Sequence, residues 1–359
     1  MFKQTFAAFI ALSGLSGGAA AQTTAEEATA PQAAALACTL PKIVDTATLE
    51  QASGSDLMTV PVTINGTTRQ FLLDIGMTKP TSVSPELMAK LSLPENAYVG
   101  EKVVQNNPLG GSGLQNVRVY DVTHDLGGGA RDTHVRLNSF GVGNATGRHL
   151  QMLVTEKGEI GRSASYDGFL TGDFFRQYDV ELDFGGKQIT WLTPTKCTDP
   201  NQAVFWAHSE VAIVPVTLAK DGRYQMPAMI QGHVINAEID TGSARTVMRR
   251  DIAEQYVGLK ADTPKMMPLG DLKDGMGMQI YVSNFPEIIF AGGGVTAQNV
   301  PVLIQDYSMV PALSRHVDLL TRAPTTERIP DLVIGMDVLK HLHMYVVPGV
   351  GRVYVTAAD

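Results

Sequence analysis

The chain has 359 residues, of which 44% are apolar and 18% are charged, and this length suits two domains of ordinary size. Its 35 glycines and 19 prolines favour a turn-rich β protein over a helical bundle. A formal net charge of −8 argues against a nucleic-acid partner, which ordinarily meets a basic surface.

Residues 1–21 have the features of a secretory signal peptide. Lys3 carries a positive charge, residues 6–15 are apolar, and Ala19–Ala21 resemble a small-residue cleavage site. The apolar stretch is too short to span a bilayer, and no other stretch is long and apolar enough to do so. We therefore expect a mature chain without a membrane span, in the periplasm or secreted. Residues 22–55 are expected to form a flexible linker and N-terminal segment.

Cys38 and Cys197 are the only cysteines of the chain. In an oxidising compartment an even pair usually forms a disulfide, so we predict a Cys38–Cys197 bond, with two free thiols as the alternative. Closing so long a loop stabilises a fold by about 4–5 kcal/mol in the chain-entropy model.

Two stretches of the chain resemble each other. Residues 64–66 (Ile-Asn-Gly) lead through an apolar run to Asp74-Ile75-Gly76, and residues 230–232 (Ile-Gln-Gly) lead to Asp240-Thr241-Gly242. In both, the Asp lies ten positions after the Ile (74 − 64 and 240 − 230). Each stretch predicts a strand that delivers an Asp into a glycine turn.

Further landmarks recur in the same order in both halves, as an internal duplication requires. The matched segments are predicted strands and short helices: 60–63 with 214–217, 81–93 with 246–259, 168–175 with 331–339, and 178–192 with 343–355. The interval from the Asp to the closing Gly is similar, 98 residues (172 − 74) and 95 residues (335 − 240). We expect Asp173 and Asp337, just after these glycines, to cap the short helices.

Glycine-rich hairpins are predicted between these landmarks. Gly111, Ser112 and Gly113 lie in the first half, and residues 275–278 lie in the second. Such a hairpin is a candidate flap that closes over a ligand, and an ordinary tight turn is the alternative. For Gly111–Gly113 the flap assignment rests on position alone.

Two aspartates held in glycine turns suit the hydrolysis of an amide. The reaction needs a base that activates water and an acid that protonates the leaving nitrogen. Two carboxyl groups in contact do both, because the pair shares one proton. Glycine in each turn allows a close backbone approach. This chemistry requires no metal and no cofactor.

The Asp-Thr-Gly-Ser turn at residues 240–243, the later apolar-apolar-Gly strand and the second copy of both resemble the aspartic peptidases. Each half is similar to a retropepsin-like domain, and the fused pair is similar to the two-lobed pepsin arrangement. The resemblance covers residues 57–359. It implies a mostly β fold of two similar retropepsin-like β-barrel lobes, residues 56–198 and 209–359, with an active-site cleft between them.

The resemblance also implies residue roles. Asp74 and Asp240 are the catalytic pair, and Gly76 and Gly242 shape the turns. Thr241 is expected to donate a hydrogen bond across to the other turn. Ser243 is expected to bond Asp240. The strands at residues 170–172 and 334–335 are expected to pass beneath Asp74 and Asp240.

The first turn departs from the family pattern. Ile75 stands where a threonine would complete a reciprocal grip, and Met77 stands where a serine or threonine would orient Asp74. Losing one neutral hydrogen bond costs about 1 kcal/mol, so the asymmetry is tolerable. We predict an exported aspartic endopeptidase that cleaves polypeptides as a monomer, since one chain supplies both acids. The alternative is a catalytically impaired protein that holds a peptide or cell-wall segment in the same cleft.

Overall fold

The structure is a computed structural model of the chain, in which residues 38–359 form one compact unit. It describes residues 41–77, 80–91, 98–99, 134–155, 160, 164–176, 178–197, 204–206, 211–219, 222–260, 265–273, 277–292, 294–306 and 329–358. The predicted signal peptide, the flap candidates Gly111, Ser112 and Gly113, and Cys38 lie outside these residues.

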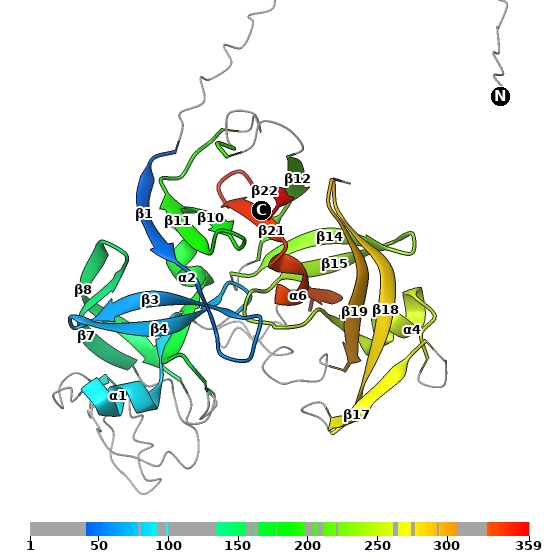
Figure 1. Cartoon of the computed structure of the whole chain (residues 1–359), viewed down its shortest axis with the longest axis horizontal. Coiled ribbons are helices and arrows are strands. Elements are labelled where there is room, and N and C mark those ends of the chain that lie inside the picture. The colour runs from blue at the N-terminus through cyan, green and yellow to red at the C-terminus, as the bar shows by residue number, and fades with distance from the viewer. Residues whose placement is uncertain are drawn as a thin grey trace, which may run out of the picture. The chain divides into compact units, whose positions relative to one another are not determined.

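Six strands of the first half close into a β-barrel (Figure 1). In spatial order they are β3 (Met58–Ile64), β4 (Thr67–Asp74), β9 (Gly168–Thr171), β5 (Ser82–Val83), β8 (Ala145–Val154) and β7 (His134–Val142), and β7 pairs back with β3. Two short strands extend the edges, β2 (Glu50–Gln51) and β6 (Tyr98–Val99). Helix α1 (Pro85–Leu91) follows β5, and α2 (Gly172–Phe175) follows β9.

The second half repeats this barrel. Its six strands are β14 (Tyr224–Ile230), β15 (His233–Ile239), β20 (Leu332–Ile334), β16 (Val247–Arg249), β19 (Thr296–Gln305) and β18 (Gln279–Phe290), and β18 pairs back with β14. At the edges lie β13 (Thr217–Leu218) and β17 (Met267–Lys273). Helices α4 (Arg250–Tyr256) and α6 (Met336–Leu339) follow β16 and β20. The predicted class, mostly β with two similar barrel lobes, is confirmed.

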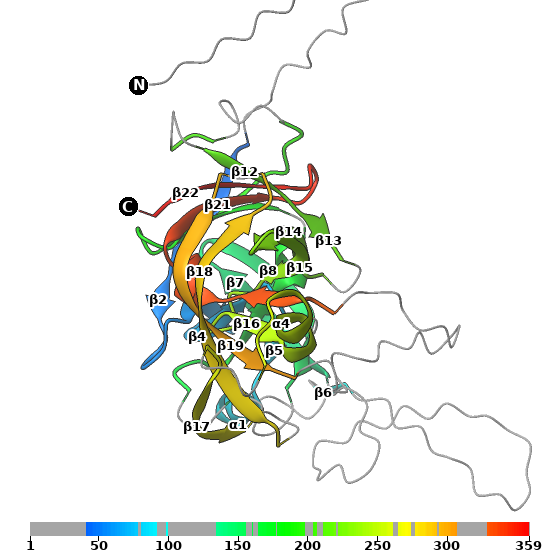
Figure 2. The ribbon, with the colours of Figure 1, turned by 90° about the vertical axis from the view of Figure 1, so that its right-hand side faces the viewer.

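The two halves share a third sheet. Its strands are β1 (Ile43–Thr48), β11 (Gln188–Leu192), β10 (Asp179–Asp183), β21 (Leu342–Val347), β22 (Arg352–Ala357) and β12 (Ala212–Pro215). The halves meet where β10 pairs antiparallel with β21, with Val180 opposite Val346. Figure 2 shows this sheet from a second direction, with β21, β22 and β12 together.

Strands β1 and β2 lie within residues 22–55, which the sequence predicted to be a flexible linker and N-terminal segment. The ordered fold therefore begins before residue 56. β1 pairs along its length with β11, and the buried Asp45 Oδ2 accepts a hydrogen bond from the Ala145 N–H at 2.7 Å. These long-range partners, and not local composition, order the segment.

The sequence match between Val60–Thr63 and Val214–Thr217 is wrong. Residues 60–63 belong to β3, which pairs with β4 and so leads to Asp74. The strand in the same position of the second half is β14, which pairs with β15. Residues 214–217 instead span β12, which pairs with β22 in the shared sheet, and the start of β13. Valine and threonine favour any strand, so this likeness carried no information on topology.

Asp179, on the shared sheet, is a buried carboxyl group with a raised pKa. Its Oδ2 accepts hydrogen bonds from the Thr195 N–H at 2.7 Å and the Tyr345 hydroxyl at 3.2 Å. Burial nevertheless raises its pKa from 3.8 to about 6. The folded protein thus holds this proton more tightly than the unfolded chain, and ionisation of Asp179 destabilises the fold as pH rises through that interval.

We therefore expect Asp179→Asn to gain thermal stability relative to the wild type as pH rises, because asparagine has no charge to bury. The measurement is the melting temperature of both proteins at pH 4.5 and pH 8. The difference between variant and wild type is expected to be more positive at pH 8. A difference that is the same at both pH values would contradict the assignment.

Candidate active site

Two strand ends bring the predicted aspartates to the junction of the halves. β4 ends at Asp74, and β15 ends at the residue before Asp240. β9 runs parallel to β4 and places Leu170 beside Leu73. β20 runs parallel to β15, and the Asp240 N–H donates to the Ile334 carbonyl at 3.0 Å. The two strands predicted to pass beneath the aspartates lie there.

The register of these strands corrects the sequence match by one residue. Leu170 and Ile334 hold the same position in their halves, so the counterpart of Gly335 is Thr171 and not Gly172. Gly335 is required, because a Cβ there would overlap backbone atoms of Arg245. In the first half the fully buried Thr171 is accommodated.

The two glycine turns interlock. A Cβ on Gly76 would overlap the carboxyl group of Asp240, and a Cβ on Gly242 would overlap that of Asp74. Asp74 is only 6% exposed, and Asp240 is partly buried. The two carboxyl groups lie close enough for each to alter the pKa of the other. The structure therefore brings Asp74, Asp240 and both predicted turn glycines together.

The backbone of each turn donates to its own aspartate. The Gly242 N–H donates to Asp240 Oδ1 at 2.8 Å. In the first turn the backbone N–H groups of Met77 and Gly76 donate to Asp74. These donors need no particular side chain, so the first turn orients its carboxyl group although Met77 stands in the place of a serine or threonine.

Burial is the main electrostatic influence on the pair. It raises the pKa of Asp74 well above its usual range, and the charge of Asp240 raises that pKa further. Burial also raises the pKa of Asp240, against the backbone bond from Gly242 and the bond to Asp74, which lower it. Two adjacent carboxyl groups with raised pKa values retain one proton between them over a wide pH range.

Thr241 links the two turns. Its buried hydroxyl donates to the Leu73 carbonyl at 2.8 Å and accepts from the Ile75 N–H at 3.1 Å. This is the cross-turn bond expected of Thr241. Ile75 has no hydroxyl with which to reciprocate, and its side chain packs in the hydrophobic core instead. The first turn therefore lacks the counterpart of the hydrogen bond that Thr241 makes across the two halves.

Residues 226–338 match the sequence profile of the aspartyl protease family. The match runs from β14 to α6 and includes the Asp240 turn. A search of curated proteins finds no match. Among solved structures, conglutin gamma, a basic 7S globulin from lupine seeds, is 11% identical, with 89% of this chain and 95% of that chain covered and a TM-score of 0.49. Basic 7S globulin from soybean is 10% identical, with 88% and 95% covered and a TM-score of 0.46.

Two side chains near the Asp240 turn, Ser243 and Asp337, form other hydrogen bonds than the sequence predicted. The Ser243 hydroxyl donates to the Arg245 carbonyl at 2.7 Å, and the Ser243 N–H donates to the main-chain carbonyl of Asp240 at 3.4 Å. Asp337 does not cap α6, whose N-cap has no side-chain bond. Its carboxylate accepts from the Thr246 N–H at 3.0 Å and hydroxyl at 2.7 Å.

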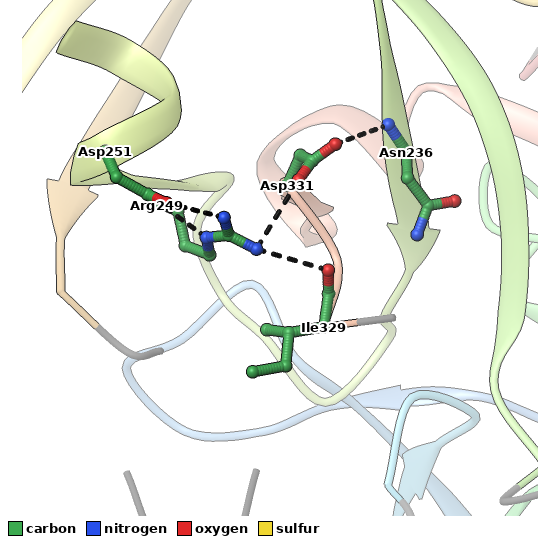
Figure 3. Close-up of polar contacts among 5 residues, drawn as sticks. All are labelled: Asn236, Arg249, Asp251, Ile329 and Asp331. Atoms are coloured by element: carbon green, nitrogen blue, oxygen red, sulfur yellow. Dashed lines mark hydrogen bonds and ion pairs between the residues drawn. The ribbon is translucent and has the colours of Figure 1, made fainter. Parts of the chain in front are cut away.

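A polar cluster anchors the strand beneath Asp240 (Figure 3). Arg249 forms a two-pronged ion pair with Asp251 at 2.6 and 2.8 Å and lies 3.5 Å from Asp331. Asp331 immediately precedes β20, and its Oδ2 accepts from the Asn236 N–H on β15 at 2.9 Å. The start of β20 is thereby held to both β15 and α4.

Two features near the pair were missed by sequence reasoning. Arg223 and Glu238 form a buried ion pair at 3.0 Å on the second-half side. The other is Tyr166: burial raises the pKa of its hydroxyl, and the charge of Asp74 raises it further. The sequence feature that could have indicated the ion pair is Glu238, a single glutamate in the apolar run before Asp240.

Two predictions fall on residues outside those that the structure describes. The flap at Gly111, Ser112 and Gly113 stays a prediction, as does the Cys38–Cys197 disulfide. Among the residues described, no helix is long and apolar enough to cross a membrane. Within the same residues, no cluster of three or more His, Cys, Asp or Glu side chains is arranged to hold a metal ion.

Thr241→Val is expected to lower the free energy of unfolding by about 1–3 kcal/mol, because it removes a bonded hydroxyl and leaves buried backbone groups unpaired. The measurement is urea unfolding. Thr68→Val, at an exposed position of β4, is the matched control and should change stability little. Equal stability of Thr241→Val and the wild type would contradict the linking role of Thr241.

Proposed function

We propose that this protein is an exported aspartic endopeptidase that works as a monomer with the two-lobed pepsin arrangement. The observation that carries the proposal is the contact between the carboxyl groups of Asp74 and Asp240, each lying over the glycine of the opposite turn. The profile match over residues 226–338 supports the same chemistry.

In the proposed reaction, water bound between the two carboxyl groups attacks the scissile carbonyl carbon. The ionised carboxylate takes a proton from the water, and the protonated partner gives its proton to the carbonyl oxygen. The carboxyl group that took the proton from water then gives it to the leaving nitrogen as the C–N bond breaks. Its partner regains a proton from a hydroxyl group of the tetrahedral intermediate, which restores the pair. Asp74 Oδ1 is a buried acceptor without a partner in the described part of the chain, which suits the binding of this water. No covalent intermediate, metal or cofactor takes part.

The second candidate is a protein that binds a peptide or cell-wall segment without cleaving it. The asymmetry of the two turns favours this candidate, because Ile75 has no hydroxyl group with which to form the counterpart of the Thr241 hydrogen bond. Met77 likewise contributes apolar packing, against Leu72, Ile160 and Phe169, in place of a hydroxyl group. The two candidates differ in one property, the rate of peptide hydrolysis.

Ile75→Thr tests the consequence of this asymmetry. By the pairing of the two turns, a threonine at position 75 has the Ile239 carbonyl as its acceptor. We expect a folded protein with a kcat/KM equal to or above that of the wild type, measured on one peptide substrate. Ile75→Val, which keeps an apolar side chain, is the control. A collapse of activity in Ile75→Thr alone would mean that the apolar residue itself is required.

The proposal as a whole is tested with residues 22–359, produced by an oxidising export route. The protein is incubated with a denatured protein substrate from pH 3 to pH 8, and new termini are identified by mass spectrometry. We expect cleavage that is fastest below neutral pH, where the pair retains one proton. Absence of new termini across this range would contradict the enzyme proposal and favour the binding candidate.

Export and the Cys38–Cys197 disulfide belong to the same proposal. The signal-peptide features of residues 1–21 support export, and Cys197, buried beside Val204, is not a free thiol. Alkylation of the unfolded, unreduced protein should leave both cysteines unmodified. Modification of both would contradict the disulfide.

A further inference from the structure

The two halves differ in what lies beside their aspartates. Glu238 precedes Asp240 by two residues at the end of β15, so both side chains face the same side of the strand. Glu238 Oε2 lies 3.0 Å from Arg223 Nη1, and the two side chains are 4% and 7% exposed. A buried ion pair therefore adjoins one member of the catalytic pair.

The first half has leucines in the same positions. In the two strands that lead to each Asp turn, equivalent positions of the two halves differ by 166 in residue number, as Asp74 and Asp240 do (240 − 74). Arg223 therefore corresponds to Leu57, and Glu238 corresponds to Leu72. Leu72 is 2% exposed, and Leu57 packs in its cluster. The first barrel therefore forms with an apolar pair at the positions that Arg223 and Glu238 occupy in the second. Packing alone does not require the ion pair, whose burial carries a desolvation cost.

We propose that Arg223 and Glu238 are positioning residues that make the two aspartates unequal, holding the negative charge on Asp240 and the shared proton on Asp74. This inference rests on the proposed function. It assigns the two roles that the reaction needs: Asp240 is the base that takes the proton from water, and Asp74 is the acid that protonates the substrate carbonyl.

The charged and titratable groups around the pair agree with this direction. Burial raises the pKa of Asp240, and the positive charge of Arg223 is among the influences that oppose this rise. Glu238, two residues before Asp240, is the ion-pair partner of Arg223. Asp74 faces Asp240 and Tyr166, and the charge of Asp240 raises the pKa of Asp74. Glu238 opposes Arg223 in sign, but its hydrogen bond fixes the guanidinium group at this site.

The test replaces the ion pair with the leucines of the first half, as Arg223→Leu/Glu238→Leu. Both residues are changed because a single replacement leaves a buried charge unpaired. Aspartate carboxyl carbons are labelled with ¹³C and followed by NMR from pH 3 to pH 8, and kcat/KM is measured over the same range. Asp74→Asn and Asp240→Asn samples assign the two signals.

In the wild type we expect the Asp240 signal to move to the carboxylate position at lower pH than the Asp74 signal. In the leucine variant we expect this separation to shrink and the acid limb of kcat/KM to move up by half a pH unit or more, a threefold or larger loss of rate at a fixed pH on that limb. Glu254→Gln, which removes a charge from an exposed position of α4 in the same half, should change neither.

An unchanged separation in the leucine variant, or a wild type in which Asp74 ionises first, would overturn the proposal. The NMR readout needs no turnover, so it decides the inference even if the wild type cleaves nothing and the proposed function fails. Conversely, cleavage with identical pH profiles and NMR titrations would retain the function and reject the inference. If the leucine variant does not fold, Arg223→Gln/Glu238→Gln removes both charges while retaining hydrogen-bonding groups.

Discussion

Asp74→Asn and Asp240→Asn are each expected to lower kcat by about 10³-fold or more, because one carboxyl group cannot be both base and acid. The structure supports dependence on both, since the carboxyl group of each aspartate lies against the glycine of the opposite turn. The measurement is the initial rate of peptide cleavage at acid pH for the wild type and both variants. Glu254→Gln, which neutralises an exposed carboxylate of α4, is the matched control.

The same variants carry an internal check that they are folded. Because the pKa of each aspartate is raised in the folded protein, ionisation opposes folding as pH rises above the usual aspartate range. Each Asn variant should therefore melt at or above the wild-type temperature at pH 7. Cleavage that survives Asp74→Asn would contradict a site made from both halves.

Gly242→Ala is expected to disrupt the site through one added methyl group. A Cβ at this position would overlap the Asp74 carboxyl group, so that group must move away from Asp240. Overpacking of this kind destabilises a protein by about 1–3 kcal/mol. A displacement of a catalytic group by about 1 Å lowers rates by about 10²-fold. The measurements are urea unfolding and kcat/KM on one peptide.

Gly349→Ala is the matched control for this substitution. A Cβ there would meet only the Thr195 carbonyl, at an ordinary 3.9 Å, so activity and stability should be unchanged. Gly76→Ala should repeat the effect of Gly242→Ala from the other side, against Asp240. Full activity in Gly242→Ala would show that the two turns do not approach each other as closely as described.

Local patterns allowed much of this fold to be predicted. Apolar strands that end in an Asp-containing glycine turn are short and contiguous, so the sequence alone indicated β4, β15 and the positions of Asp74 and Asp240. The closing strands β9 and β20 were found for the same reason. In these segments the residues that determine the backbone lie within a few positions of one another.

Other features depend on partners far away in the chain and were missed or misplaced. The match of Gly172 with Gly335 was one residue out, because the register is set by pairing with β4 and β15. Ser243 bonds the carbonyl of Arg245, a choice fixed by the path of the turn. Arg223 becomes significant only because the hairpin places it against Glu238. Local sequence does not encode such contacts.

The binding of a tetrahedral mimic tests most directly whether Asp74 and Asp240 form one catalytic pair. A peptide whose scissile amide is replaced by a tetrahedral hydroxyl-bearing group is compared, by calorimetry or inhibition, with the matched amide peptide. An active pair is expected to bind the mimic at least about 10²-fold more tightly than the amide, and to lose this preference in Asp240→Asn. Equal affinity for the mimic and the amide would contradict catalysis and favour the binding candidate.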